Sequence, residues 1–270
     1  MNTTIQTLFS IAKESGAAIL DIYKSASNDI DYKQDNSPLT IADKKSNEII
    51  VNRLQEHFPG IPVLSEESAT IPHEERKNWE QFWLVDPLDG TKEFIKKSGE
   101  FTINIALVEN DKPVTGLIHV PVKNITYFAY DNQSYRVTGD SLDYLVSIQV
   151  RKASSNRLTV VASRDHAGEK VKNLLEKLPD AATMSMGSSL KFCLVAEGAA
   201  DLYYRDVPTM EWDTAAAQAI VEAAGGAVLT EGGEPLVYNK NSLKNPELIT
   251  VGETSFNWSK FLKVKEKVVE

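Results

Sequence analysis

Sulfur and imidazole ligands are scarce in this chain of 270 residues. The single cysteine, Cys193, excludes an internal disulfide and fits a reducing compartment. Six residues further on stands Ala199, where a phosphatase with a cysteine nucleophile would have arginine. The four histidines form no pair with metal-ligand spacing, and the motif H-E-x-x-H does not occur. Thiol chemistry and zinc chemistry are therefore poorly supported.

Long apolar runs and several catalytic motifs are also missing. No stretch approaches the length of a membrane span, and residues 1–20 hold Lys13 and Glu14 within an amphipathic pattern. The motifs G-x-S-x-G, G-x-x-x-x-G-K-[ST] and G-x-G-x-x-G are absent. We therefore expect a cytoplasmic protein without a membrane span, and peripheral association at the inner membrane face stays open.

Positive charge is in short supply. Acidic residues number 38 against 29 basic residues, which gives a net charge of -9. This balance argues against a nucleic-acid polymer as partner, and an anionic small molecule would need metal ions or local lysine and arginine. Composition leaves the oligomeric state open between monomer and homodimer.

Carboxylates, by contrast, are placed where they could bind a metal ion. The apolar run 82–85 predicts a short buried strand, and Asp86 and Asp89 follow it in a turn marked by Pro87 and Gly90. Such a turn could bring both carboxylates and an intervening carbonyl to one point, and hard oxygen ligands suit Mg²⁺. For this segment taken alone, an Asx turn with a helix N-cap is the more common explanation.

Three further acidic residues stand at the ends of predicted elements. Glu66 follows the apolar run 61–64 and precedes a second glutamate, a pairing that is costly beside buried residues without a cation. Asp213 comes just before a helix that opens with three alanines, whose small size would let the helix approach another backbone. The alternatives without a metal are a solvated turn for Glu66, an N-cap for Asp213, and a capping box with Thr40 for Asp43.

The apolar pattern predicts an α+β fold with two subdomains. Residues 1–150 open with two amphipathic helices, the second ending at Pro59-Gly60, and continue as short strands typical of an antiparallel meander. Residues 151–270 alternate strands and helices, as an α/β unit does. The predicted strands are 61–64, 82–85, 101–108, 114–120, 125–130, 158–162, 201–204, 227–230 and 248–251; the predicted later helices are 166–178, 188–196, 214–224 and 258–264, and 74–80 is an exposed connection.

Three segments taken together resemble the inositol monophosphatase superfamily of Mg²⁺-dependent, lithium-sensitive phosphatases. They are L-S-E-E at 64–67, W-L-V-D-P-L-D-G-T at 83–91 and W-D-T-A-A at 212–216, and their order and spacing cover essentially the whole chain. Segments 89–94 and 187–198 are similar to the 3'(2'),5'-bisphosphate nucleotidase branch. The resemblance implies a layered α/β/α/β/α sandwich of the type that fructose-1,6-bisphosphatase also has.

The resemblance also implies roles for the matched residues. The implied ligands of two Mg²⁺, out of two or three ions per site, are Glu66, Asp86, the Leu88 carbonyl, Asp89 and Asp213. Asp86 would bridge the two ions, which could hold a phosphate and activate a water for in-line attack without a phosphoenzyme. Asp43 and Thr91, together with Glu66, would form the catalytic group that positions and deprotonates this water.

The implied substrate is a small nucleotide of sulfur metabolism, 3'-phosphoadenosine 5'-phosphate. 3'-Phosphoadenylyl sulfate is implied as a further substrate. Ser188, Lys191 and Arg205 would contact the second phosphate or the base, at a helix start that favours anions. His166 would lie near the adenosine, or it is an ordinary exposed histidine at a helix start. Substrate contacts are also implied for Glu66, Leu88, Asp89, Gly90, Thr91 and Asp213.

Two alternatives stay open beside the nucleotidase. An inositol monophosphatase or a sugar-bisphosphate phosphatase would use the same metal site with a different pocket. A non-catalytic metal-binding regulatory protein would be expected to have lost a ligand, whereas Glu66, Asp86, Asp89, Thr91 and Asp213 are all present.

Overall fold

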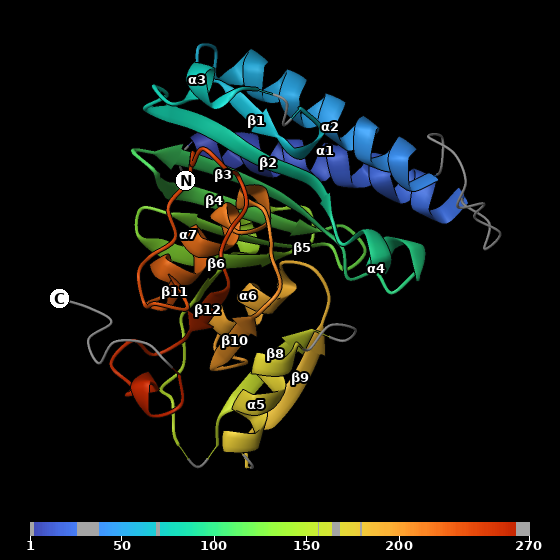
Figure 1. The fold of residues 1–270 in the computed structure, drawn as a ribbon. Helices are drawn as coiled ribbons and strands as arrows, with labels where there is room; N and C mark the ends of the chain where they lie inside the picture. Colours follow the sequence, from blue (N-terminus) through green and yellow to red (C-terminus); the bar gives the residue numbers. More distant parts are fainter. Residues whose placement is uncertain are drawn as a thin grey trace.

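Five layers of helices and sheets make up the computed structural model (Figure 1), which describes residues 3–25, 38–68, 71–155, 157–163, 168–178 and 180–262. The long helices α1 (Thr3–Ser25) and α2 (Pro38–His57) cover one face of a seven-stranded sheet. Helices α6 (Leu190–Ala196) and α7 (Ala215–Ala223) lie between this sheet and a five-stranded one. Helix α5 (Glu169–Lys177) packs on the outer face of the second sheet. The predicted α/β/α/β/α sandwich is confirmed.

The first sheet follows the chain in strand order, from β1 to β7. Its strands are β1 (Val63–Ser65), β2 (Gln81–Asp89), β3 (Thr102–Glu109), β4 (Lys112–Val120), β5 (Ile125–Tyr130), β6 (Gln133–Thr138) and β7 (Val146–Ile148). Strands β1 and β2 are parallel, and every later neighbour is antiparallel. The predicted meander is confirmed and extends through β6 and β7, which the sequence analysis missed. The signal was Asp131-Asn132, which forms the β5–β6 turn with φ of 53° and 56°.

The second sheet mixes parallel and antiparallel neighbours in the order β11-β12-β10-β8-β9. Its strands are β8 (Thr159–Ser163), β9 (Ala182–Met186), β10 (Leu202–Arg205), β11 (Ala227–Thr230) and β12 (Leu248–Val251). Strand β8 pairs in parallel with β9 and β10, as expected for alternating strands and helices. The sequence analysis missed β9 because this edge strand is largely exposed and has no apolar run.

Several short elements differ from their predictions. The expected exposed connection at 74–80 contains α3 (His73–Arg76), whose buried Arg76 donates hydrogen bonds to Asn239 Oδ1 at 2.9 Å and to the Asn241 carbonyl at 3.0 Å. The expected C-terminal helix is only the 3₁₀ turn η4 (Trp258–Lys260) within the residues described. The remaining short elements are η1 (Glu66–Ser68), α4 (Thr91–Ile95), η2 (Leu142–Tyr144) and η3 (Glu211–Asp213).

Side chains from both halves of the chain share the core between the sheets. Leu84 and Ile118 from the first sheet pack there with Ile220 of α7 and Tyr203 of β10. Two further cores fill the spaces under α1 and α2 and outside the second sheet. The division into subdomains 1–150 and 151–270 stays a prediction. Among the described helices, none has both the length and the apolarity that crossing a membrane requires.

Candidate metal centre and active site

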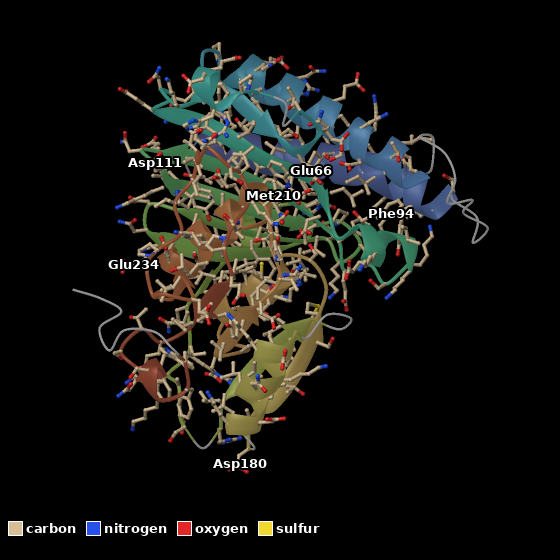
Figure 2. All side chains as sticks on the ribbon, viewed as in Figure 1. Glu66, Phe94, Asp111, Asp180, Met210 and Glu234 are labelled. Atoms are coloured by element: carbon tan, nitrogen blue, oxygen red, sulfur yellow. The ribbon has the colours of Figure 1, made fainter. Side chains whose placement is uncertain are left out.

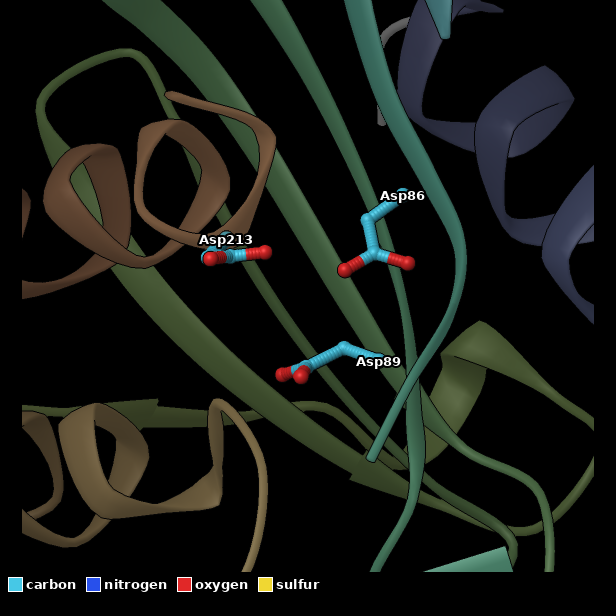
Figure 3. Close-up of side chains that lie close together, drawn as sticks. All are labelled: Asp86, Asp89 and Asp213. Atoms are coloured by element: carbon cyan, nitrogen blue, oxygen red, sulfur yellow. The ribbon is translucent and has the colours of Figure 1, made fainter. Parts of the chain in front are cut away.

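The alternation of β2 determines which way its first aspartate faces. Phe82 and Leu84 belong to the core between the two sheets, whereas Trp83 and Val85 belong to the core under α1 and α2. Because side chains on a strand alternate, Asp86 lies on the same face as Leu84. This buried aspartate therefore faces the middle layer of helices, and Figure 3 shows its carboxylate pointing to that side.

A bulge brings the second aspartate of β2 to the same face. Strict alternation would put Asp89 on the opposite face from Asp86. However, Asp86 pairs with Asn104 and Asp89 pairs with Thr102, so three steps on β2 lie opposite two on β3. The extra residue reverses the alternation and returns Asp89 to the inner face. The predicted turn directly after Val85 is therefore wrong, since the strand continues as a bulged strand to Asp89.

Asp213 completes a cluster of three carboxylates, hereafter the aspartate cluster. One oxygen each of Asp86, Asp89 and Asp213 lies within 4.8 Å of the other two, and the side chains point toward one another (Figure 3). Asp213 ends η3, which contacts β2 and β3 just before α7. A Cβ on Gly116 of β4 would lie 2.3 Å from the Ala216 carbonyl oxygen, so helix and sheet approach closely. The expected close approach of this helix start to another backbone is confirmed.

Local hydrogen bonds hold one oxygen of Asp86 and one of Asp213. The Leu88 amide donates to Asp86 Oδ1 at 3.0 Å, and the Met210 amide donates to Asp213 Oδ2 at 2.7 Å. The first of these is an Asx-type contact, as the structural alternative for this segment predicted. The N-cap of α7 is Thr214, however, so the alternative of Asp213 as helix N-cap is wrong.

Asp89 is held by more hydrogen bonds than its two neighbours. Its Oδ2 accepts from Ser188 Oγ at 2.6 Å, the Ser189 amide at 2.7 Å and Ser189 Oγ at 2.8 Å. The following helix α4 has Gly90 as its N-cap, so Asp89 does not cap it. Gly90 has φ of 100°, and a Cβ there would lie 3.2 Å from the Phe101 Cα, which makes glycine the fitting residue.

The aspartate cluster disfavours its own negative charge. Burial, followed by the negative charge of Asp89, raises the pKa of Asp213 to about 7. Burial and the same neighbour raise the pKa of Asp86 well above its usual range. A cation would relieve this cost, and a donor set made only of carboxylate oxygens suits a hard cation such as Mg²⁺. The residues present therefore fit a divalent cation.

Glu66 lies at the edge of the cluster. Ser65 pairs in parallel with Val85, so Glu66, the first residue after β1, follows beside Asp86 of β2. Burial, followed by the charge of Asp89, raises the pKa of the Glu66 carboxyl, although the residue is exposed as a whole. Figure 2 labels Glu66 together with Met210, from the two segments that approach β2. Glu66 stands outside the group of carboxylates within 4.8 Å, and its role and that of the Leu88 carbonyl stay predictions.

Asp43 lies inside α2, in its second turn, and not at the start of the helix. Helix α2 begins at Pro38, so Thr40 and Asp43 are inside it and the capping-box alternative is wrong. Burial, followed by the negative charge of Glu67, raises the pKa of Asp43 to about 8. Its Oδ1 is buried and has no hydrogen-bond partner within the described chain. Helix α2 contacts α4, which begins at the exposed Thr91, and the joint role of these two residues stays a prediction.

A cavity of about 380 Å³ opens beside the aspartate cluster. Asp89 and Asp213 line it together with Lys191 and Arg205. Lys191 is buried, which lowers its pKa to about 8, and its Nζ donates to the Ser188 carbonyl at 2.6 Å. Arg205 Nε is buried without a hydrogen-bond partner among the described residues. Both acidic and basic side chains thus line the cavity, Lys92 and Glu93 among them.

Of the two remaining residues predicted to bind substrate, Ser188 lies at the cavity and His166 is not described. Ser188 lines the cavity, but its hydroxyl donates to Asp89, and the amide of Ser189 at the start of α6 does the same. The expected open helix start for a second phosphate is therefore already occupied by a carboxylate. His166 lies outside the described residues.

Sequence analysis missed several residues of this site. Tyr203 and Thr209 line the cavity, and no sequence pattern pointed to them. Thr102 and Asn104, paired with Asp89 and Asp86, are buried polar residues on a strand that is otherwise apolar in that stretch. Polar side chains at alternate positions of a buried strand were the available signal, because buried polar groups need partners.

Comparison with known proteins gives the family. The profile of the inositol monophosphatase family matches residues 1–255, so the chain belongs to that family. The 3'(2'),5'-bisphosphate nucleotidase CysQ of Escherichia coli K12 is 45% identical over 238 residues, which cover 87% of this chain and 94% of that protein. The protein of the same name from Haemophilus influenzae is 39% identical over 251 residues, covering 92% of each chain.

Solved structures agree with this assignment. The crystal structure of CysQ from Bacteroides thetaiotaomicron superposes with a TM-score of 0.84 at 42% identity, over 93% of this chain and 98% of that one. Inositol monophosphatase II from Staphylococcus aureus gives a TM-score of 0.78 at 20% identity, over 97% of this chain and 94% of that one. The second likeness shows the shared fold alone.

Proposed function

We propose that this chain is a Mg²⁺-dependent 3'(2'),5'-bisphosphate nucleotidase, which hydrolyses 3'-phosphoadenosine 5'-phosphate to AMP and phosphate. 3'-Phosphoadenylyl sulfate would be a further substrate. The observation that carries the proposal is the cavity that Asp89 and Asp213 of the aspartate cluster line together with the side chains of Lys191 and Arg205. A substrate with one phosphate at the carboxylates and a second one at these cations suits this lining. The CysQ relatives, at 39% and 45% identity, support the same choice.

The aspartate cluster would hold the metal ions. Asp86, Asp89 and Asp213 would bind one Mg²⁺, and Asp86 would share a second with Glu66 and the Leu88 carbonyl. When bound, Mg²⁺ would neutralise the phosphate oxygens and assist both the attacking and the leaving oxygen. Support comes from the raised pKa values of Asp86 and Asp213, which a nearby cation would return toward the ordinary range.

The other residues would orient the substrate and handle the proton. Lys191 Nζ and the unpartnered Arg205 Nε would hold the phosphate that does not react. Asp43 Oδ1 would accept the proton of the attacking water, with the Thr91 hydroxyl orienting that water. The pKa of Asp43, about 8, makes its carboxylate a stronger base than an ordinary aspartate.

A substrate panel tests the proposal. Phosphate release would be measured with and without Mg²⁺ on 3'-phosphoadenosine 5'-phosphate, inositol 1-phosphate and fructose 1,6-bisphosphate. We expect the bisphosphate nucleotide to have the highest kcat/KM, and to exceed inositol 1-phosphate by at least about tenfold, since only a substrate with a second phosphate also engages Lys191 and Arg205. A preference for inositol 1-phosphate or the sugar bisphosphate would replace the nucleotidase with another phosphatase. Absence of turnover on all three would favour a non-catalytic role.

A further inference from the structure

A buried chain of hydrogen bonds reaches Asp89 from β3, hereafter the Asn104 relay. Asn104 Nδ2 donates to Ser189 Oγ at 2.9 Å, and Ser189 Oγ lies 2.8 Å from Asp89 Oδ2. Asn104 is 1% exposed and Ser189 is 2% exposed, so water does not compete for these contacts. Hydrogen bonds in such a site are stronger and more directional than on a surface.

Donor counting fixes the direction of the relay. The Asn104 amide nitrogen can only donate, so it takes a lone pair of Ser189 Oγ and leaves the single hydroxyl hydrogen free. That hydrogen can point to Asp89 Oδ2, or to the Asp213 carbonyl oxygen at 3.1 Å. The Ser189 hydroxyl thus contacts the side chain of Asp89 in β2 and the backbone carbonyl of Asp213 in η3.

A second branch reaches the same carboxylate oxygen. Thr102 Oγ1 lies 2.6 Å from Ser188 Oγ, which donates to Asp89 Oδ2. Ser188 has φ of 53°, in the left-handed region, and this backbone turn presents both serines to Asp89. Since the three donors found in the described part of the chain converge on Oδ2, the other oxygen of Asp89 is left for the aspartate cluster.

We infer that Ser189, oriented by Asn104, is a positioning residue for the Asp89 carboxylate and sets the direction in which that group offers its free oxygen to a divalent cation. Asn104 donates to Ser189 Oγ and accepts from Thr102 Oγ1 at 3.0 Å, so it reaches Asp89 through these hydroxyl groups. The inference rests on the proposed function, because it requires that the aspartate cluster binds a cation. Outer hydrogen-bond partners of metal ligands commonly contribute about 10- to 100-fold to metal affinity.

Calorimetric titration with Mg²⁺ tests the role of Ser189. Ser189→Ala should bind Mg²⁺ at least about tenfold more weakly than the wild type. It should also show a smaller rise of Tm on adding Mg²⁺, whereas kcat at saturating Mg²⁺ should fall far less than the affinity.

The matched control is Ser134→Ala on β6, which removes another buried hydroxyl, 1% exposed, that donates to the Ile220 carbonyl. It should lower the metal-free Tm comparably and bind Mg²⁺ like the wild type. Equal Mg²⁺ affinity in Ser189→Ala and the wild type would overturn the inference.

A double-mutant comparison tests the relay itself. Asn104→Ala should weaken Mg²⁺ binding, and its loss combined with that of Ser189→Ala should be less than additive, since part of the effect of Asn104 passes through that hydroxyl. Losses that add would overturn the role of Asn104. Should Ser189→Ala fail to fold, Asn104→Ala decides alone, and an unchanged Mg²⁺ affinity would overturn the inference. If the wild type binds no Mg²⁺, the proposed function fails; if the wild type binds it and the variants match it, only the positioning role fails.

Discussion

The fold holds Asp86 and Asp213 in places that disfavour their negative charge. Asp86 is buried, and its nearest charged neighbours are other carboxylates, so its ionised form has no compensating cation among them. Like charges at this separation in a site with little water repel strongly. A bound divalent cation would reverse the balance, which makes metal affinity, pH and stability parts of one equilibrium.

Replacing the central carboxylate separates folding from turnover. Asp86→Asn keeps the volume and the oxygen that accepts from the Leu88 amide, so we expect the metal-free Tm to be retained or raised. Phosphate release at saturating Mg²⁺ should fall by at least about 100-fold, because the bridging charge is lost. Asp131→Asn, on an exposed turn with φ of 53°, is the control and should change neither quantity. Near-normal turnover in Asp86→Asn would remove Asp86 from the metal site.

The fall of stability with rising pH should disappear when saturating Mg²⁺ is added. Without metal, the pKa values of Asp213 and Asp43, about 7 and about 8, lie above those of the unfolded chain. The folded state then binds the extra protons, so its stability falls as pH rises through these values. With saturating Mg²⁺ the carboxylates are ionised throughout, and the apparent Mg²⁺ affinity should rise with pH. Tm measured between about pH 6.5 and about pH 8, with and without Mg²⁺, checks this; an equal Mg²⁺ increment at every pH would contradict it.

Two other groups limit the useful pH range. Burial lowers the pKa of His119 to about 4, so stability is also lost as pH falls below the ordinary histidine value. Burial lowers the pKa of Lys191 to about 8, so above this pH the folded state binds fewer protons than the unfolded chain and stability rises with pH. The interval between these two effects therefore reports mainly on the carboxylates.

At the scale of elements, the site depends on one bulge and one close contact. The apolar run before Asp86 and the positions of both β2 aspartates could be predicted from the sequence. The bulge could not, because it depends on the register between β2 and β3, where Asp89 pairs with Thr102. The hydroxyl groups that hold Asp89 come from a segment about a hundred residues away, and no local pattern links them to β2.

The contact between β4 and α7 should matter for both stability and metal binding. Gly116→Ala would place a Cβ 2.3 Å from the Ala216 carbonyl oxygen, so the start of α7 must shift, and with it Asp213. We expect a loss of about 1–3 kcal/mol in the free energy of unfolding and weaker Mg²⁺ binding. Gly232→Ala is the control, because its Cβ would meet only Thr230 Oγ1 at 3.6 Å. Denaturant unfolding and Mg²⁺ titration give the two quantities, and a stable Gly116→Ala with normal Mg²⁺ affinity would contradict the account.

At the scale of the molecule, the cavity draws on both sheets. Asp89 comes from the first sheet, Arg205 ends a strand of the second, and Asp213 and Lys191 come from the helical layer between them. The sequence predicted the α+β class and, through the family resemblance, the order of the layers. It could not predict that Lys191 and Arg205 line one cavity with Asp89, since this depends on how the second sheet packs against α6.

Removing a cation should discriminate between substrates. Lys191→Met and Arg205→Ala should lower kcat/KM for 3'-phosphoadenosine 5'-phosphate by roughly 10- to 150-fold, the scale of about 1.5–3 kcal/mol for a charge-assisted contact. The loss on inositol 1-phosphate, which has one phosphate, should be much smaller. Lys152→Ala changes an exposed lysine outside this cavity and should leave both substrates unaffected. Equal losses on both substrates would give Lys191 and Arg205 a structural role instead.

We expect Mg²⁺ at the aspartate cluster to direct removal of the 3'-phosphate while Lys191 and Arg205 hold the 5'-phosphate. Phosphorus NMR of the reaction of 3'-phosphoadenosine 5'-phosphate with the wild-type protein tests it most directly. The account predicts adenosine 5'-phosphate and inorganic phosphate as the only products, formed with Mg²⁺ and not with a chelator present. Adenosine 3'-phosphate as the product, or equal turnover in the chelator, would contradict it.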